Sequence, residues 1–306
     1  MKGQNTRPRI SVITPCLNGV RYVGEAIESV LKQDYPNMEH IVVDGGSTDG
    51  TLEVLSRYHH LSVLKGPDRG VYDALNKALA VAKGELIGIL NSDDRYADGV
   101  FAAVRNHLTD EKVMALAGTA VSFRGSANVS QDEVDRFADA GRDLLYHSTL
   151  GNPAINAWFF RAGLFSQIGG FDPTYKVAGD REFMLRLACS GLPCAQMPKL
   201  VCQYRIHPGS MTFAGNEEIG ETVAREHNKM THDYLRRDDL PKRGRYLIRQ
   251  ARTRDTLRLA IRSAQQHDWR RLIVYCAAGT RHDLIWPLRF AKRAIAALSS
   301  GLKAIN

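Results

Sequence analysis

The chain has 306 residues, of which 44% are hydrophobic and 24% charged, and both shares are usual for globular proteins. This composition excludes a chain that is disordered throughout, and the length is enough for one α/β domain with an additional segment. The net charge of +8 is uneven, because residues 1–233 hold 24 Lys and Arg against 28 Asp and Glu, whereas residues 234–306 hold 17 against 5. A partner attracted by positive charge should therefore bind the last quarter of the chain.

The first hundred residues alternate between short β-branched runs and amphipathic segments. Apolar runs that end at Pro, Asn or Gly predict strands at residues 9–14, 39–44, 61–64 and 85–90. Apolar residues at helical spacing predict helices at residues 22–33, 51–58 and 71–82, the second of them capped by Ser47 or Thr48. Such alternation is typical of βαβ units, so we predict an α/β, Rossmann-like fold with a mostly parallel central sheet.

Beyond residue 94 the periodicity is weaker. It predicts helices at residues 102–108, 162–168 and 181–190, and strands at residues 113–123 and 200–204. Residues 158–160 form an apolar run, and residues 124–143 are polar enough to be either a mobile segment or a helix. From about Glu217 onward the sequence is helical throughout.

Acidic residues follow three of the first four predicted strands. Asp44 follows the second strand, Asp68 the third, and Asp93 and Asp94 the fourth. Ligands of an open parallel sheet bind beyond the carboxyl ends of its strands, so these carboxylates should share one edge. Adjacent carboxylates repel unless a cation or a donor neutralises them, and such oxygen ligands suit Mg²⁺ or Mn²⁺. The alternative is that Asp93 and Asp94 only open a turn or cap the next helix.

Several common functional motifs are absent. The glycines at 45–50 do not follow the G-x-G-x-x-G pattern, and neither a P-loop nor a G-x-S-x-G motif occurs. The five cysteines form no C-x-x-C pair and are expected to be reduced thiols. The first nine residues are polar, and no run of about 18 uncharged apolar residues occurs. We therefore expect no secretory signal, no membrane-spanning helix and a cytoplasmic location.

An ordered set of motifs resembles the family 2 glycosyltransferases. The matching stretches are residues 11–18 (SVITPCLN), 28–36 (ESVLKQDYP), 42–50 (VVDGGSTDG), 68–77 (DRGVYDALNK), 84–94 (GELIGILNSDD), 169–172 (GGFD) and 178–186 (AGDREFMLR). The resemblance covers residues 10–210 and does not reach the basic segment. It implies a GT-A fold, a nucleotide-sugar donor and inversion at the anomeric carbon. The implied division is a glycosyltransferase domain at 1–216, with a donor half at 1–96 and an acceptor half at 97–216, followed by a basic helical tail at 217–306.

The resemblance also assigns the donor-binding residues. Asp94 would bind a divalent ion, Mn²⁺ or Mg²⁺, on the donor diphosphate, and Asp93 would contact the ribose or the ion. Asp44 and the backbone of Thr14 and Pro15 would hold the nucleotide.

Two further residues belong to the predicted nucleotide site. Asn18 lies in the loop after the first strand, and Asp68 lies where a contact with the base is expected. Many family members have a second acid after the position of Asp44, where this chain has Gly45. A UDP-sugar is the favoured donor, but this departure leaves the base open.

Asp180 matches the family's catalytic base. Inversion in a single displacement needs a carboxylate that takes the proton of the acceptor hydroxyl. The alternative is that Asp180 caps the helix that begins there. Glu182 is the next candidate, but two residues along a helix it would face away from a site that Asp180 faces.

Two other side chains have competing interpretations. His207 lies where some relatives complete the metal site with a histidine, and its alternative is a loop histidine bonded to backbone. Trp158 could stack on an acceptor sugar, although an aromatic residue beside Phe159 and Phe160 is more typical of a core.

The tail combines basic charge with Trp, Leu and Ile. This pattern suits a helix in the interface of an anionic membrane, where polyprenyl-linked acceptors lie. Its alternative is a packed helical subdomain with a basic, solvated face. No nucleic-acid recognition motif accompanies the charge, so we expect no nucleic-acid partner.

The residues and the resemblance together predict a metal-dependent, inverting hexosyl- or N-acetylhexosaminyltransferase. Its acceptor would be a glycan or a lipid-linked molecule, and it would work at the inner face of the cell membrane in polysaccharide or cell-envelope glycan synthesis. The enzyme alternative is a sugar-nucleotide pyrophosphorylase, and the other is a catalytically silent binding subunit of a glycan assembly complex.

Overall fold

The β-branched and aromatic runs form strands at nearly all the predicted places. The computed structural model describes residues 7–124, 136–137, 143–210 and 217–282. Its strands are β1 (Ile10–Cys16), β2 (Met38–Asp44), β3 (Leu61–Lys65), β4 (Leu86–Ile89), β5 (Arg95–Tyr96), β6 (Ala115–Arg124), β7 (Arg136–Phe137), β8 (Trp158–Arg161) and β9 (Cys194–Ile206).

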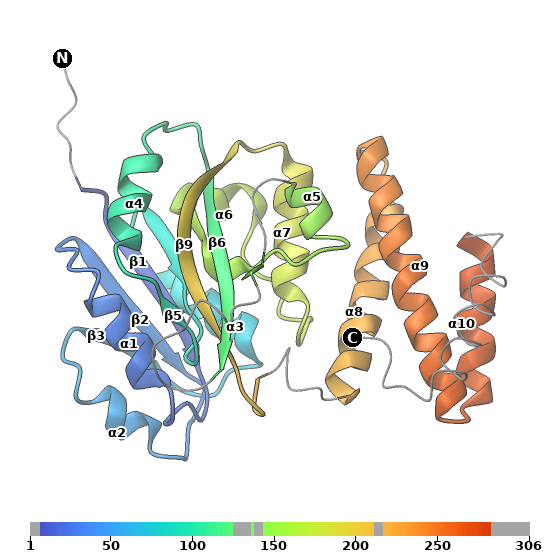
Figure 1. Cartoon of the computed structure of the whole chain (residues 1–306), viewed down its shortest axis with the longest axis horizontal. Coiled ribbons are helices and arrows are strands. Elements are labelled where there is room, and N and C mark those ends of the chain that lie inside the picture. The colour runs from blue at the N-terminus through green and yellow to red at the C-terminus, as the bar shows by residue number, and fades with distance from the viewer. Residues whose placement is uncertain (1–6, 125–135, 138–142, 211–216, 283–306) are drawn as a thin grey trace. The chain divides into compact units, whose positions relative to one another are not determined.

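The helices follow the predicted order as well. They are α1 (Val23–Leu31), α2 (Thr51–Leu55), α3 (Val71–Val81), α4 (Val100–His107), α5 (Leu144–His147), α6 (Ala162–Ile168), α7 (Gly179–Ser190), α8 (Glu217–Leu235), α9 (Lys242–Gln265) and α10 (Trp269–His282). The chain divides into two units, Met1–Ala214 and Gly215–Asn306, and the strands all belong to the first (Figure 1).

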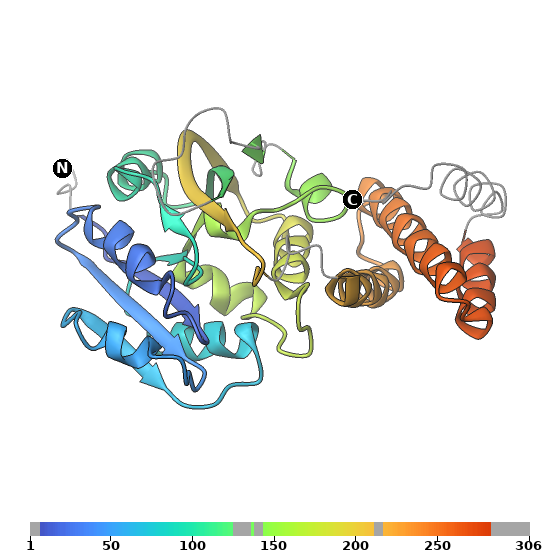
Figure 2. The same cartoon turned by 60° about the horizontal axis from the view of Figure 1, so that its bottom comes forward.

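One sheet joins the described strands in the order β3-β2-β1-β4-β8-β6-β9-β5, with β7 paired to β6. Strands β1 to β4 pair in parallel, as predicted for the first hundred residues. The second part of the sheet is mixed, because β8 runs antiparallel to β4 and β6 while β6 and β9 run parallel and side by side (Figure 2). The parallel part places the carboxyl ends of β1, β2 and β4 at one edge.

The helices cover both faces of the parallel strands. Val23 and Ile27 of α1 pack with Leu55 of α2 and Val42 of β2 on one face. Helix α3 contacts β1 and β2, and Figure 1 shows it on the other face. This arrangement follows from right-handed crossovers, since the connection from β3 to β4 runs opposite to the two before it.

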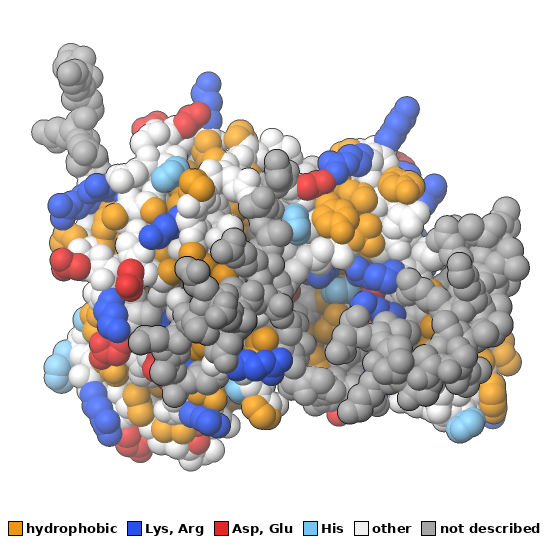
Figure 3. All heavy atoms as spheres, in the orientation of Figure 1, with side chains coloured by type: hydrophobic (Ala, Val, Ile, Leu, Met, Phe, Trp, Pro, Cys, Tyr) orange, Lys and Arg blue, Asp and Glu red, His pale blue; other side chains and the backbone are white. Residues whose placement is uncertain are grey.

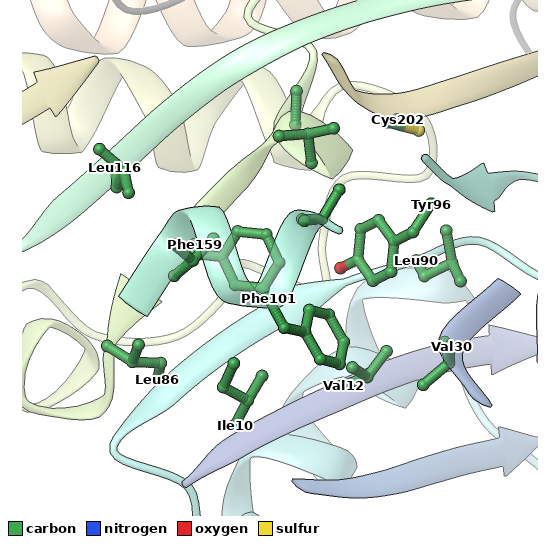
Figure 4. Close-up of a cluster of buried hydrophobic side chains, with 14 of the residues drawn as sticks. Ile10, Val12, Val30, Leu86, Leu90, Tyr96, Phe101, Leu116, Phe159 and Cys202 are labelled. Carbon is green, nitrogen blue, oxygen red and sulfur yellow. The ribbon is translucent and has the colours of Figure 1, made fainter. Parts of the chain in front are cut away.

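A buried cluster joins the parallel strands to the second part of the sheet. Ile10 and Val12 of β1 meet Phe101 of α4, Tyr96 of β5 and Phe159 of β8 (Figure 4). The ring centroids of Phe101 and Phe159 are 6.0 Å apart in an edge-to-face contact. Because residues from α4, β5 and β8 share one core with β1, this cluster ties the two parts of the sheet together.

Some local predictions are wrong in detail. Helix α2 is preceded by Gly50 in a left-handed conformation, and neither Ser47 nor Thr48 caps it. The Asp49 carboxylate instead accepts a hydrogen bond from the Thr51 backbone N–H (3.0 Å). Strand β9 begins at Cys194 rather than at residue 200, and β5 and α5 were not predicted. Of the polar segment 124–143, residues 125–135 and 138–142 lie outside the described residues.

The described part of the second unit, residues 217–282, is helical, as predicted. Helices α8 and α10 both pack against α9. Among the helices that the structure describes, none is long and apolar enough to cross a bilayer. All five cysteines lie in described segments and none forms a disulfide.

The stability of the sheet should depend on pH through His40. Burial is the larger cause that lowers the pKa of His40 from 6.5 to about 3, so the folded protein keeps the ring neutral while the unfolded chain binds a proton below pH 6.5. Stability is therefore lost as the pH falls through this range, by about 2 kcal/mol between pH 6.5 and pH 5.

Urea unfolding of the wild type and of His40→Gln at pH 7, 6 and 5 checks this prediction. The variant should lose less free energy of unfolding over the same range, and equal losses in both proteins would contradict it.

Candidate functional site

The loops after β1 and β2 are held together at the sheet edge. The Asn18 side-chain oxygen accepts a hydrogen bond from the Thr48 backbone N–H (2.9 Å), and the Asn18 N–H donates to the Ser47 hydroxyl (2.8 Å). Asn18 has a φ of 51°, a left-handed conformation that Asn tolerates better than most residues. Asn18 thus shapes the mouth of the predicted nucleotide site.

Strand β1 separates from β4 at this edge because of Pro15. The Leu90 N–H donates to the Ile13 carbonyl, and the next bond of a parallel ladder would need an N–H at position 15, which proline lacks. Thr14 is completely buried, with its hydroxyl 2.9 Å from Nε2 of His40. The Thr14 side chain is therefore taken up inside the fold, and Pro15 is the partly exposed residue at this end of β1.

Asp44 is the last residue of β2, and only one of its two carboxylate oxygens accepts hydrogen bonds from described residues. Its Oδ1 accepts hydrogen bonds from the backbone N–H groups of Gly46 (3.0 Å) and Ser47 (2.9 Å). Asp44 is 1% exposed, and Oδ2 is buried with no donor among the described residues. A buried acceptor without a partner is unfavourable, so Oδ2 is suited to a donor on a bound molecule.

Asp68 explains the glycine that follows Asp44. A Cβ atom at Gly45 would lie 2.6 Å from Oδ2 of Asp68, closer than a side chain can approach. Oδ1 of Asp68 accepts a hydrogen bond from the Gly70 backbone N–H (2.9 Å), which fixes the carboxylate there. The Asp68 carboxylate therefore occupies the space in which a second acid after Asp44 would begin.

Asp93 and His207 meet although 113 residues separate them along the chain. Nε2 of His207 is 3.0 Å from Oδ2 of Asp93, and both side chains are partly exposed. The Gly209 N–H donates to Nδ1 of His207 (3.1 Å), which puts the proton of a neutral ring on Nε2, facing Asp93. Within the described segments, no group of three or more His, Cys, Asp or Glu side chains is arranged to hold a metal ion.

Asp94, the predicted metal ligand, has a different environment. It is completely buried; Oδ1 accepts from the Arg205 backbone N–H (2.9 Å), and Oδ2 accepts from the side chains of Asn156 (2.8 Å) and Asn91 (3.2 Å). Burial, with the nearby charge of Asp93, raises the pKa of Asp94 well above its usual value. Both oxygens of Asp94 therefore face protein donors, whereas the Asp93 carboxylate is partly exposed.

Arg205 is the main residue that the sequence analysis missed. It is 1% exposed, and its Nε donates to the backbone carbonyl of Asp93 (2.9 Å) while another nitrogen pairs with Glu25 (2.6 Å). Its guanidinium lies 4.4 Å from the ring centroid of Tyr22 and 4.6 Å from that of Phe123. Arg205 therefore fixes the end of β9 to the loop that carries Asp93.

A simple signal could have found Arg205. Residues two apart in a strand point to the same side, so extending the predicted strand from residue 204 to His207 would have placed Arg205 on the side of His207, although β9 itself ends at Ile206. A cavity of about 310 Å³ opens beside this pair, between the start of α1 and the end of β9.

Asp180 is oriented by a residue from the first half of the fold. The Tyr72 hydroxyl is 2.7 Å from the Val177 carbonyl and 3.3 Å from Oδ1 of Asp180, and the Arg181 N–H donates to the same Oδ1 (2.7 Å). A Cβ atom at Gly179 would lie 2.7 Å from the Tyr72 ring, so only glycine allows this close packing. Tyr72 thus joins the start of α3 to the start of α7.

The structure also gives the surroundings of the other candidates in the acceptor region. The N-cap of α7 is Ala178, so Asp180 is not the N-cap residue, although it accepts a hydrogen bond from the Arg181 N–H in the first turn. Glu182 is 8% exposed and pairs with Arg186 (2.6 Å). Trp158 is completely buried and stacked on Phe160, so the possibility that it stacks on a sugar is wrong.

Known proteins resemble this chain over most of its length. The family model for glycosyl transferase family 2 matches residues 11–168. A Bacillus subtilis protein named for teichuronic acid biosynthesis, TuaG, is 30% identical over 217 residues, which are 68% of this chain and 83% of that protein. A PGL/p-HBAD biosynthesis glycosyltransferase of Mycobacterium bovis is 30% identical over 64% of this chain and 73% of its own length.

Solved structures show the same fold. The S. aureus TarS fragment 1–349, in complex with UDP-GlcNAc, has a TM-score of 0.64 at 19% identity, over 90% of this chain and 81% of that one. The mannosyltransferase PcManGT of Pyrobaculum calidifontis, in complex with GDP-Man and Mn²⁺, has a TM-score of 0.62 at 23% identity, over 96% and 81%. These likenesses confirm the predicted GT-A fold with C-terminal helices.

Replacement of the buried guanidinium should destabilise the first unit. Arg205→Met removes the bonds to Glu25 and to the Asp93 carbonyl, so we expect a loss of about 3 kcal/mol in the free energy of unfolding. Arg95 also reaches Glu25, at 3.4 Å, and is the matched control. Arg95→Met should cost about 1 kcal/mol. Urea unfolding measures both, and equal losses would show that Arg205 has no special role.

Proposed function

Because this chain belongs to glycosyl transferase family 2 and is a glycosyltransferase, we propose that it is metal-dependent and inverting, with a nucleotide-sugar donor and a cell-envelope glycan or lipid-linked acceptor. The observation that carries the proposal is the 3.0 Å approach of Asp93 and His207 at the edge where the parallel strands end. Family membership weighs against the pyrophosphorylase alternative, and donor turnover separates an enzyme from a silent subunit.

The nucleotide would lie over the ends of β1 and β2. The buried, unpartnered Oδ2 of Asp44 suits an N–H donor of a base, such as the imide of uracil. Asp68 supplies a second carboxylate beside Gly45, Asn18 holds the neighbouring loop, and the backbone of Thr14 and Pro15 would complete the site. Solved neighbours that bind UDP, UDP-GlcNAc and GDP-Man support a nucleotide-sugar donor, and a UDP-sugar remains our preferred assignment.

Asp93 and His207 would hold the divalent ion, Mn²⁺ or Mg²⁺. A carboxylate with an imidazole nitrogen is a suitable donor set for Mn²⁺, and open positions would remain for diphosphate oxygens. When bound, the ion neutralises charge on the departing diphosphate. A ring nitrogen that ligates a metal carries no proton, so His207 would change tautomer and release the Gly209 N–H. Asp94 would act through Arg205 and Asn156, by holding the loop in place.

Asp180 would be the catalytic base. Its carboxylate takes the proton of the acceptor hydroxyl, whose oxygen bonds to the anomeric carbon as the bond to the diphosphate oxygen breaks. The electron pair of that bond leaves with the nucleoside diphosphate. The hydrogen bonds from Tyr72 and from the Arg181 N–H orient the carboxylate for this step.

The acceptor half and the acceptor class follow from position and relatives. We assign the donor half to residues 1–96 and the acceptor half, which contains Asp180, to residues 97–216. The relatives named for teichuronic acid and PGL/p-HBAD biosynthesis support an acceptor in the cell envelope. The transferred sugar would be a hexose or an N-acetylhexosamine.

The first test separates the two adjacent carboxylates. Release of nucleoside diphosphate from UDP- and GDP-sugars should need Mn²⁺ or Mg²⁺ and stop with EDTA. Asp93→Asn and His207→Ala should raise the Kd for Mn²⁺, measured by electron paramagnetic resonance with UDP present, about 10- to 100-fold. Asp94→Asn should mainly lower the melting temperature, because the substituted amide cannot accept all three hydrogen bonds.

If Asp94→Asn instead weakens Mn²⁺ binding and Asp93→Asn does not, Asp94 is the metal ligand and our assignment of Asp93 is wrong. If the wild type binds neither UDP nor GDP, and releases no nucleoside diphosphate from UDP- or GDP-sugars, the enzyme proposal fails and the silent-subunit alternative replaces it.

The second test addresses the base. Asp180→Asn should lower kcat about 10²- to 10⁴-fold with little change in UDP binding by calorimetry, because the proton acceptor is lost and the nucleotide site is intact. Glu182→Gln is the matched control, since Glu182 pairs with Arg186, and it should keep most of kcat. If Glu182→Gln loses more activity than Asp180→Asn, the assignment of the base is wrong.

A further inference from the structure

Helix α10 has one apolar face that the fold uses. Its partly buried residues pack against the cluster on α9, and the contacting side chains are Leu272, Tyr275 and Cys276 on α10 and Leu257, Ala260 and Ile261 on α9. One such face is all that a helix needs to join a helical unit.

A second apolar face of α10 is exposed. Trp269 is 59% exposed, Ile273 68% and Val274 63%. Among the described residues, nine large hydrophobic side chains are exposed, and these three lie within the six residues 269–274. At about 100° per residue, all three fall with Arg270 in an arc of about 140°. An exposed apolar patch of this kind marks an interaction surface.

The segment that carries this face is strongly positive. Residues 242–282, which span α9 and α10, hold eleven Lys and Arg but only two Asp. Arg270 lies within the exposed arc, and no described residue forms an ion pair with it. Figure 3 shows exposed hydrophobic side chains beside Lys and Arg at the upper end of α9, in the same helical unit. Apolar and basic groups on one helix face match a surface that is apolar beneath and anionic on top.

We propose that the outer face of α10 binds the interface of an anionic phospholipid bilayer, with Trp269, Ile273 and Val274 inserted among the lipid headgroups and Arg270 against their phosphates. This inference rests on the proposed function, because a membrane site is useful to an enzyme whose acceptor is lipid-linked. It deepens that function by naming the surface that brings the enzyme to its acceptor.

Vesicle flotation tests the proposal on the full chain. Vesicles of phosphatidylcholine and phosphatidylglycerol, mixed two to one, should carry the wild type, and vesicles of phosphatidylcholine alone should carry much less. The double variant Ile273→Gln, Val274→Gln should bind the anionic vesicles at least about tenfold more weakly. Val81→Gln, at an exposed valine of α3, is the matched control and should bind like the wild type.

A local readout places Trp269 in the bilayer. Lipids with brominated acyl chains should quench the tryptophan emission of the wild type more than that of Trp269→Phe, and the difference reports Trp269 alone. Equal quenching, or equal flotation of the wild type and the double variant, would overturn the proposal.

Two controls separate this proposal from others. Donor turnover by the double variant should stay unchanged in solution, since its substitutions lie outside the site; loss of flotation with normal turnover supports the surface. Normal wild-type turnover without flotation overturns the surface and leaves the proposed function standing. If light scattering shows a wild-type dimer that the double variant abolishes, the face binds a second copy of the chain and the membrane proposal is wrong.

Discussion

The buried carboxylate of Asp94 is the contact on which the site depends. A completely buried acid is costly unless donors surround it, and here Asn91, Asn156 and the Arg205 backbone N–H supply them. These donors come from three distant parts of the chain, so satisfying one acid brings the ends of β4 and β9 together. The Arg205 side chain strengthens the same junction through the Asp93 carbonyl and Glu25. The approach of Asp93 to His207 is a consequence of this packing.

The rest of the site follows from how the parallel strands end. Pro15 stops the ladder between β1 and β4, and beside this gap Asp44 keeps a buried oxygen without a described donor. Tyr72 then connects this region to Asp180 on α7, in the second half of the sequence. In the function we propose, the half of the fold that would hold the donor thus also orients the Asp180 carboxylate. This coupling gives family 2 chemistry a physical basis in this chain.

The helical unit shows a different balance. Helix α9 packs between α8 and α10 although eight of its residues are Lys or Arg, and Asp255 neutralises part of this charge within the unit. Helix α10 satisfies its packing with one face and exposes Trp, Ile and Val on another. An apolar surface that the fold itself does not use, on a strongly basic unit, is best explained by an anionic membrane partner.

The sequence by itself determined the elements of the first ninety residues and the edge at which Asp44, Asp68 and Asp93 lie, because periodicity and strand ends are local properties. It also determined the family, through motifs that stand in order along the chain. Only the tertiary structure showed that Asp93 and Asp94 have different environments, since the donors to Asp94 come from Asn156 and Arg205, more than 60 residues away. For the same reason the role of Gly45 and the burial of Trp158 were open until their neighbours were known. A local pattern states which residues are present, whereas burial and partners, which set their chemistry, depend on contacts between distant segments.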